Sequence, residues 1–366
     1  MKQSERLMSL DALRGFDMLF IMGFASLVVA VCGLWPSAVT DAAAASMSHV
    51  AWDGFAHHDT IFPLFLFIAG VSFPYSVAKQ RAGGMSEGRI YAKIVRRGLT
   101  LVVLGMVYNG LFKLDFENLR IASVLGRIGL AWSIAAVLYL NFGVKTRAAI
   151  AVAVLAGYGA LSALVAAPDA VGAGPLTFEG NLAGYIDRQF LPGKLIYGSF
   201  DPEGLLSTVP AVVTAMLGMF TGEFVRRSDI RGGRKTLWMA AAAAALLAAG
   251  LAFSGVLPVN KKLWSSTFVC VVGAYSLGMF ALFYYLIDVR GWRRWTLFFR
   301  VVGLNSITIY LAQRIVGFGR ISDFFLGGIA SKCPEAVAAV ISSAGYVAVC
   351  WLFLYFLYRK NVFLKV

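Results

Sequence analysis

Apolar residues fill long stretches of the chain, and short polar segments separate them. Windows of about 20 residues give ten stretches that could cross a bilayer as helices, at residues 14–34, 60–79, 94–112, 121–142, 148–166, 205–225, 237–257, 264–287, 297–314 and 336–358. Some contain proline, which membrane helices tolerate better than soluble helices. The pattern predicts an all-α fold, a polytopic membrane helical bundle of about ten transmembrane helices that forms one domain over residues 1–366.

Composition agrees with this class, because 59% of the 366 residues are hydrophobic and only 14% are charged, which is little charge for a soluble domain. The net charge of +14 does not indicate a nucleic-acid partner, since the positive residues are spread over short loops. Of the 33 Lys and Arg residues, 23 lie in the tail up to Arg14 and in 79–97, 143–147, 226–235, 289–300 and 359–366. Cytoplasmic loops are rich in Lys and Arg, so we expect both termini inside and segments 35–59 and 167–204 outside.

All three histidines lie in one outer stretch, SHVAWDGFAHHDTIFPLFLFIAG, residues 48–70. An imidazole is suited to proton transfer near neutral pH and can also carry an acyl group. His49, with Trp52 and Asp53 close by, is therefore a candidate catalytic residue. The alternative is a solvated loop histidine.

The neighbouring HHD sequence does not predict a metal site, because adjacent side chains point apart. The four cysteines of the chain also fit no metal spacing. Asp59 stands where an expected span begins. Its carboxylate either caps that helix or belongs to the functional site.

Ionisable residues also lie inside or at the edge of the apolar stretches, namely Arg14, Asp17, Arg127, Glu223 and Arg300. Such groups usually face the protein interior or an aqueous cavity. Arg127 lies one to two turns into its span and is either a site residue or the partner of an internal ion pair with Asp59 or Asp201. Asn305 also lies within a span, where hydrogen bonding between helices is the common role.

The outer segment GYIDRQFLPGKLIYGSFDPEGLL, residues 184–206, gathers Asp187, Arg188, Asp201 and Glu203 before a span. Acidic and aromatic residues together suit a sugar or an amine. The DPEG sequence is also typical of a helix start, with Asp201 as the N-cap and Glu203 in the first turn.

Seven motifs follow one another in the order and spacing of a known family: SLDALRG, HVAWDG, DTIFPLFLFIAG, LRIASVLGRIG, GYIDR, DPEGLLSTVPAVVTAMLG and LNSITIYL. On these motifs the chain resembles the heparan-α-glucosaminide N-acetyltransferase family and its bacterial relatives, from about Leu10 to Gln313. Ala25 and Ser26 stand where the family pattern has an asparagine. Gln313 and Arg314 replace a histidine and a glutamate of the animal enzyme.

The resemblance implies that acetyl-CoA on the cytoplasmic side acetylates the amine of a glucosamine on the far side of a bacterial inner membrane. It implies a multi-pass homodimer, and it places His49 on the catalytic histidine. Asp59, Arg127, Asp187, Arg188, Asp201, Glu203 and Asn305 fall on other motif positions.

From the residue patterns together with the family resemblance, we expect the catalytic residues to be His49, Asp59, Arg127 and Asn305. Trp52, Asp187, Arg188, Asp201 and Glu203 would bind the amino sugar. The phosphates of acetyl-CoA would contact Arg14, Arg96, Arg97, Arg226 and Arg227, although the positive-inside rule accounts for the same arginines. An O-acyltransferase of a surface glycan and a transporter are the alternative functions.

Overall fold

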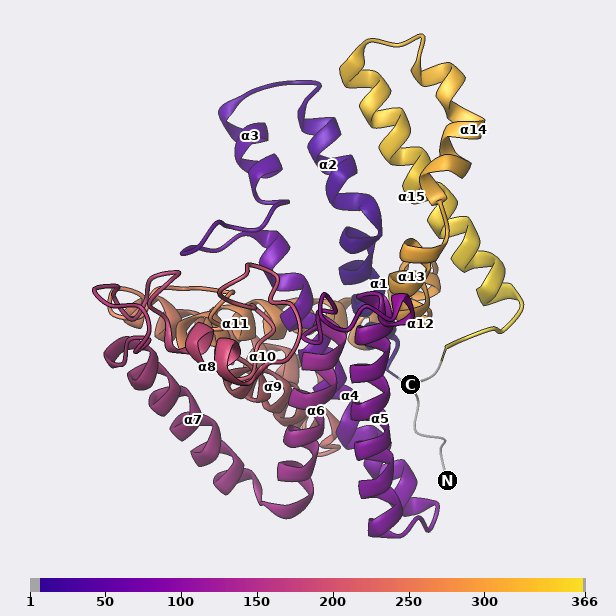
Figure 1. The fold of residues 1–366 in the computed structure, drawn as a ribbon. Helices are drawn as coiled ribbons and strands as arrows, with labels where there is room; N and C mark the ends of the chain where they lie inside the picture. Colours follow the sequence, from indigo (N-terminus) through magenta and orange to yellow (C-terminus); the bar gives the residue numbers. More distant parts are fainter. Residues whose placement is uncertain (1–6, 365–366) are drawn as a thin grey trace.

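The computed structural model describes residues 7–364 and shows an almost entirely helical chain (Figure 1). The α-helices are α1 Met8–Leu19, α2 Ala25–Cys32, α3 Ala38–Ala45, α4 Ile61–Ala82, α5 Glu87–Tyr108, α6 Val124–Asn141, α7 Val144–Leu164, α8 Leu182–Phe190, α9 Thr208–Arg226, α10 Gly232–Phe253, α11 Ser266–Phe283, α12 Thr296–Leu304, α13 Ser306–Ile315, α14 Phe318–Ala330 and α15 Glu335–Arg359. Between residues 7 and 364 the only strand-like pairing is two isolated bridges, at Arg120 with Gly193 and at Ala166 with Asn181. The predicted all-α membrane bundle is confirmed.

Eight stretches of the described chain are long and apolar enough to cross a membrane. They are Met8–Cys32, His57–Ala82, Val124–Asn141, Val144–Leu164, Thr208–Arg226, Gly232–Phe253, Ser266–Val289 and Glu335–Arg359. The stretch predicted at 94–112 overlaps α5, which starts seven residues earlier, takes in further charged residues and ends at Tyr108.

The single helix predicted at 297–314 is wrong. The chain there forms two short helices, α12 and α13, that meet at Asn305, whose φ of −122° and ψ of 25° are not helical. Asn favours such breaks because its side chain competes for local hydrogen bonds, and here its Oδ1 accepts a bond of 3.4 Å from Thr308 Oγ1.

Helix α4 lies at the centre of the bundle and packs most closely on α9. Glycines make this contact possible, since a Cβ at Gly70 would lie 2.2 Å from the carbonyl oxygen of Ala215 and a Cβ at Gly218 would lie 2.0 Å from that of Phe67. Small residues at membrane-helix interfaces allow such close approach. The start of α4, which follows directly on the histidine segment, is therefore held firmly in place.

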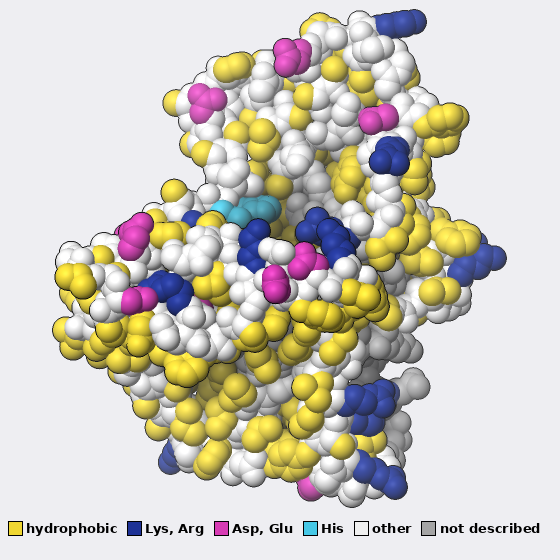
Figure 2. Space-filling view, viewed as in Figure 1, with side chains coloured by type: hydrophobic (Ala, Val, Ile, Leu, Met, Phe, Trp, Pro, Cys, Tyr) yellow, Lys and Arg dark blue, Asp and Glu magenta, His cyan; other side chains and the backbone are white. Residues whose placement is uncertain are grey.

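Helices α2, α3, α14 and α15 form a group that stands above the rest in Figure 1. The first apolar stretch bends into this group through the π-helical segment Phe20–Phe24, where Gly23 has a φ of 113°. Such a φ favours glycine, and a Cβ at Gly23 would also lie 2.7 Å from the ring of Tyr346. The bend opens a hollow between the upper group and the main bundle, which Figure 2 shows with the histidine side chains inside it.

Candidate functional site

His49 and Asp59 form the centre of the site. His49 Nδ1 lies 2.7 Å from Asp59 Oδ1, and the histidine side chain is half exposed whereas the aspartate is buried. The other oxygen, Oδ2, accepts a 3.1 Å bond from the backbone N–H of Ala56. Both roles considered for Asp59 are therefore present, since one oxygen caps the first turn before α4 and the other binds the imidazole.

This bond determines which ring nitrogen of His49 carries the proton. An ionised carboxylate only accepts hydrogen bonds, so the ring nitrogen Nδ1 of His49 donates its proton to Asp59. Nε2 of His49 then carries the free electron pair. A base whose ring is oriented by a buried carboxylate is the arrangement that general-base catalysis uses.

A third charged group, which the sequence analysis missed, completes the cluster. Lys261 Nζ lies 2.9 Å from Nδ1 and 3.2 Å from Nε2 of His49, and 3.5 Å from Oδ1 of Asp59. Burial lowers the pKa of this lysine. One signal in the sequence pointed to it, because Lys261 and Lys262 form a positive pair in an outer loop, where such residues are otherwise rare.

The other two histidines have separate surroundings. His57 Nε2 lies 3.1 Å from the hydroxyl of Tyr275, and the His57 ring packs 4.4 Å from that of Phe20. The His58 ring lies 4.5 Å from that of His49. In the part of the chain that the structure describes, no three His, Cys, Asp or Glu side chains are grouped to hold a metal ion.

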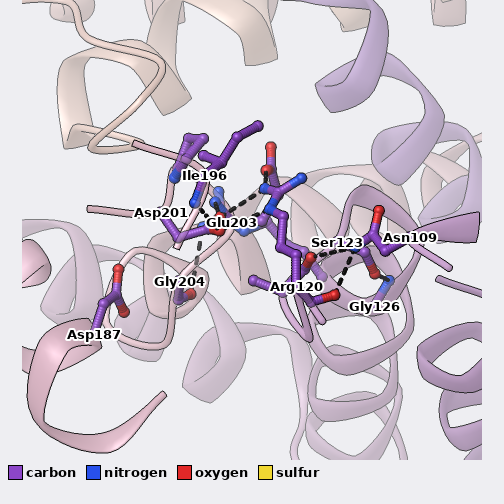
Figure 3. Close-up of polar contacts among 12 residues, drawn as sticks. Asn109, Arg120, Ser123, Gly126, Asp187, Ile196, Asp201, Glu203 and Gly204 are labelled. Carbon is purple, nitrogen blue, oxygen red and sulfur yellow. Dashed lines mark hydrogen bonds and ion pairs between the residues drawn. The ribbon is translucent and has the colours of Figure 1, made fainter. Parts of the chain in front are cut away.

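Arg120, just before α6, is a second residue that the sequence analysis did not single out. Its Nε and Nη2 each lie 2.7 Å from an oxygen of Asp201, and Nη2 also bonds Glu203 (Figure 3). Burial alone would lower the pKa of Arg120, but the two carboxylates outweigh it and raise that pKa. The predicted sugar ligands Asp201 and Glu203 are thus held by a positive charge of the protein itself.

The predicted helix start at DPEG is wrong, because α9 begins only at Thr208. Asp201 Oδ1 instead accepts a 2.9 Å bond from the backbone N–H of Glu203. The motif is a turn whose carboxylate faces Arg120. A local pattern could not reveal this partner, which lies 81 residues away.

Asp187 and Arg188, on α8, shape the outer segment from opposite sides. Asp187 Oδ1 accepts a 2.8 Å bond from the N–H of Leu205, while its buried Oδ2 has no hydrogen-bond partner within residues 7–364. Burial raises the pKa of Asp187 to about 6. Arg188 pairs with Asp169 at 2.6 Å and donates a 2.7 Å bond to the carbonyl of Ser199.

Arg127 is buried in α6 and forms none of the ion pairs considered for it. Its Nε donates a 3.3 Å bond to Thr208 Oγ1, its Nη2 bonds Ser207 Oγ, and its guanidinium lies over the Trp264 ring at 5.0 Å. The expected partners are engaged elsewhere, Asp59 with His49 and Asp201 with Arg120. Arg127 therefore fixes the start of α9.

Trp52, expected to stack on a sugar, packs within the protein. Its Nε1 donates a 2.8 Å bond to the carbonyl of Leu176. Its ring makes edge contacts with Phe178 at 5.2 Å and Phe200 at 5.9 Å. This packing joins the histidine segment to the outer segment 167–204.

A cavity of about 290 Å³ runs inside the bundle below the histidines. It is lined by one face each of α1, α4, α5 and α6 and by the residues around the break between α12 and α13. Phe62 lines it and stands three residues after Asp59, which is about one helical turn. Arg14 and Arg97, both partly buried, line it as well, so the cavity joins two cations to the turn that carries Asp59.

Comparison with known proteins identifies the family of this chain. The family model described as heparan-alpha-glucosaminide N-acetyltransferase, catalytic, matches residues 6–255. The chain belongs to this family. It is 27% identical over 375 residues to the heparan-alpha-glucosaminide N-acetyltransferase of Homo sapiens and 26% identical over 380 residues to that of Mus musculus. These alignments cover 87% of this chain but only 55% and 56% of the relatives, so the chain spans little more than half their length.

The region matched by the N-acetyltransferase family model contains His49, Asp59 and Arg127. It ends before Lys261 and Asn305. Asn305 is buried, and its amide nitrogen Nδ2 has no partner among the described residues. The residues on either side of it, Leu304 and Ser306, line the cavity. The break between α12 and α13 thus places an unused hydrogen-bond donor beside that space.

Of the five arginines expected to bind the donor, two line the cavity and three lie elsewhere. Arg14 and Arg97 line the cavity, and Arg97 also lies over the Trp132 ring at 4.2 Å. Arg96 borders a different, apolar groove on the surface of α5. Arg226 lies over the Tyr75 ring at 5.7 Å, and Arg227 forms an exposed ion pair of 2.6 Å with Asp229.

Proposed function

We propose that this chain is a membrane N-acetyltransferase that moves the acetyl group of acetyl-CoA to the amine of a glucosamine-type sugar. The observation that carries the proposal is the His49–Asp59 pair, which stands one turn above a cavity lined by two arginines. The family match and the names of the relatives support the reaction type. The bacterial inner membrane and the homodimer implied by the resemblance stay predictions.

The donor would enter from the side that carries most of the positive loops, which we take as cytoplasmic. Arg14 and Arg97 are available for charge-assisted hydrogen bonds to the donor's phosphates or to its amide groups. The narrow arm of the donor would follow the cavity toward Phe62. Its thioester would then lie close to the turn that carries Asp59, without a charged cofactor crossing the bilayer.

Different residues of the site would act in different steps of the acetyl transfer. Nε2 of His49 accepts a proton from the acceptor's ammonium or amine. The amine nitrogen attacks the thioester carbon, the carbon–sulfur bond breaks, and the departing thiolate takes a proton to leave as the thiol. Nδ2 of Asn305, which has no partner among the described residues, would bind the thioester oxygen as negative charge develops there. In a second route, His49 carries the acetyl group briefly before the amine takes it.

The acceptor would occupy the hollow that contains the histidines (Figure 2). Among the five predicted sugar-binding residues, Glu203 would meet it beside Arg120, with 10% of its side chain exposed. Trp52, Asp187, Arg188 and Asp201 bind other parts of the protein. We propose that these four hold the wall of the hollow in shape.

The test is acetyl transfer by the purified protein in lipid nanodiscs, with labelled acetyl-CoA and glucosamine. We expect an N-acetylated product, and we expect His49→Ala to abolish it while binding of acetyl-CoA is kept. Near-normal turnover by His49→Ala would refute the assignment. Product on a hydroxyl would indicate an O-acyltransferase, and no product with any acceptor would favour a transporter.

A further inference from the structure

In its protonated form, Lys261 brings a positive charge to the proposed base. Its Nζ lies within 3.2 Å of both ring nitrogens of His49 and 3.5 Å from Asp59 Oδ1. It comes from the loop between α10 and α11, more than 200 residues away along the chain. Only 15% of its side chain is exposed, so water screens this charge weakly.

Several hydrogen bonds build this contact into the fold. The N–H of Gly54 donates a 2.8 Å bond to the carbonyl of Val259, and the amide of Asn260 donates a 3.0 Å bond to Asp53 Oδ1. Next to Lys261, Lys262 donates to the carbonyl of Ala51. Val259, Asn260 and Lys262 therefore join this loop to the loop that carries His49, and Lys261 is held in place by its neighbours on both sides.

The charges in this cluster affect the protonation state of the His49 imidazole. With Asp59 ionised and Lys261 protonated, the two charges cancel around a neutral imidazole. Without the lysine, the carboxylate would favour an imidazolium, because an opposite charge at this distance stabilises the charged form of a group. A histidine that is already protonated cannot accept a proton from the substrate.

We propose that Lys261 is a positioning residue of the site, whose ammonium balances the carboxylate of Asp59 and keeps the imidazole of His49 neutral and able to accept a proton. This inference rests on the proposed function for the use of His49 as a base. The electrostatic balance itself does not depend on which acceptor is acetylated.

The groups facing the cluster come from each element around it. Asp59 and His58 contact His49 from the turn before α4, with the two rings 4.5 Å apart. Glu203, from the outer segment, and Arg127, from α6, act on Lys261 through their charges. Glu203 is neutralised by Arg120, so Lys261 is the nearest cation to the imidazole.

The first test measures the ionisation of His49 directly and requires no turnover. The chain has three histidines, so isotope-labelled histidine gives three NMR signals, of which His49→Gln identifies one. In Lys261→Met we expect the titration midpoint of the His49 signal to move to higher pH by about one unit. Lys261→Arg keeps the charge and should leave the midpoint near its original value. An unchanged midpoint in Lys261→Met would overturn the inference.

The second test measures the pH dependence of acetyl transfer. In Lys261→Met the rise of activity on the acid side should move to higher pH, so that the loss is largest at acidic pH and is recovered at alkaline pH. Lys332→Met, which removes an exposed lysine from the loop between α14 and α15, is the control and should keep the original profile. A loss of equal size at every pH, with a lower unfolding temperature, would indicate a purely structural role and would refute the inference.

The two proposals fail in different ways. If His49→Ala keeps its turnover, His49 is not the base and the proposed function is wrong, while the NMR titration still decides the role of Lys261. If turnover requires His49 but the Lys261→Met titration and rate profile match those of the original protein, only the inference about Lys261 is wrong.

Discussion

The carboxylate of Asp59 and the imidazole of His49, ten residues apart in the chain, meet at 2.7 Å. The bond connects a partly exposed ring to a buried anion in the turn before the central helix α4. His49 thereby gains a fixed orientation although it lies in a loop.

Asp59→Asn tests this orientation. The amide can still accept from Ala56, but it can also donate to Nδ1 and so stabilise the wrong form of the ring. We expect kcat for acetyl transfer to fall by about 10² to 10⁴, with little change in the affinity for acetyl-CoA. A fall in affinity with kcat unchanged would contradict a role through His49.

The two arginines in the cavity should contribute to binding of the donor. Arg97→Met is expected to raise KM for acetyl-CoA about tenfold or more, because a hydrogen bond to a charged group contributes about 1.5–3 kcal/mol. Arg96→Met is the matched control, since the adjacent side chain borders a different groove. Equal effects of the two substitutions would show that only the general positive charge of α5 matters.

The Arg120–Asp201 pair should contribute mainly to stability. Arg120→Leu leaves a buried carboxylate without its cation, which typically costs about 3–5 kcal/mol. Thermal unfolding in detergent would show a clearly lower midpoint, and Arg120→Leu combined with Asp201→Leu should recover part of the loss. Arg227→Leu breaks only an exposed pair and should leave the midpoint unchanged.

Asp187 should make the fold sensitive to pH. Burial raises its pKa from 3.8 to about 6, so the folded protein favours the protonated form. Its contribution to stability is complete below pH 4 and is lost as the pH rises through about 6. At pH 8 Asp187→Asn should therefore raise the free energy of unfolding by up to about 3 kcal/mol, and at pH 4 it should have little effect. An equal effect at both pH values would contradict the raised pKa.

The sequence predicted the membrane class and most of the helices because apolar length is a local property. It did not predict the break at Asn305, since the residues on both sides are as apolar as in any span. It identified His49 and Asp59 separately. It did not predict the bond between them, because that bond depends on the conformation of the turn before α4. Asp201 looked like a helix cap because its true partner, Arg120, is distant in the chain. Lys261 was missed for the same reason, as only the docking of two loops brings it to His49.

One helical turn, from the 3-10 segment His57–Thr60 into α4, separates Asp59 from Phe62, at the wall of the cavity. A helix is stiff over so short a length, so the carboxylate that orients His49 and the end of the donor's path keep a constant spacing whatever the surrounding helices do. Adjustment to acceptors of different size then falls to the loops that carry His49 and Lys261. A relative with another acceptor should differ in these loops and keep the first turn of α4.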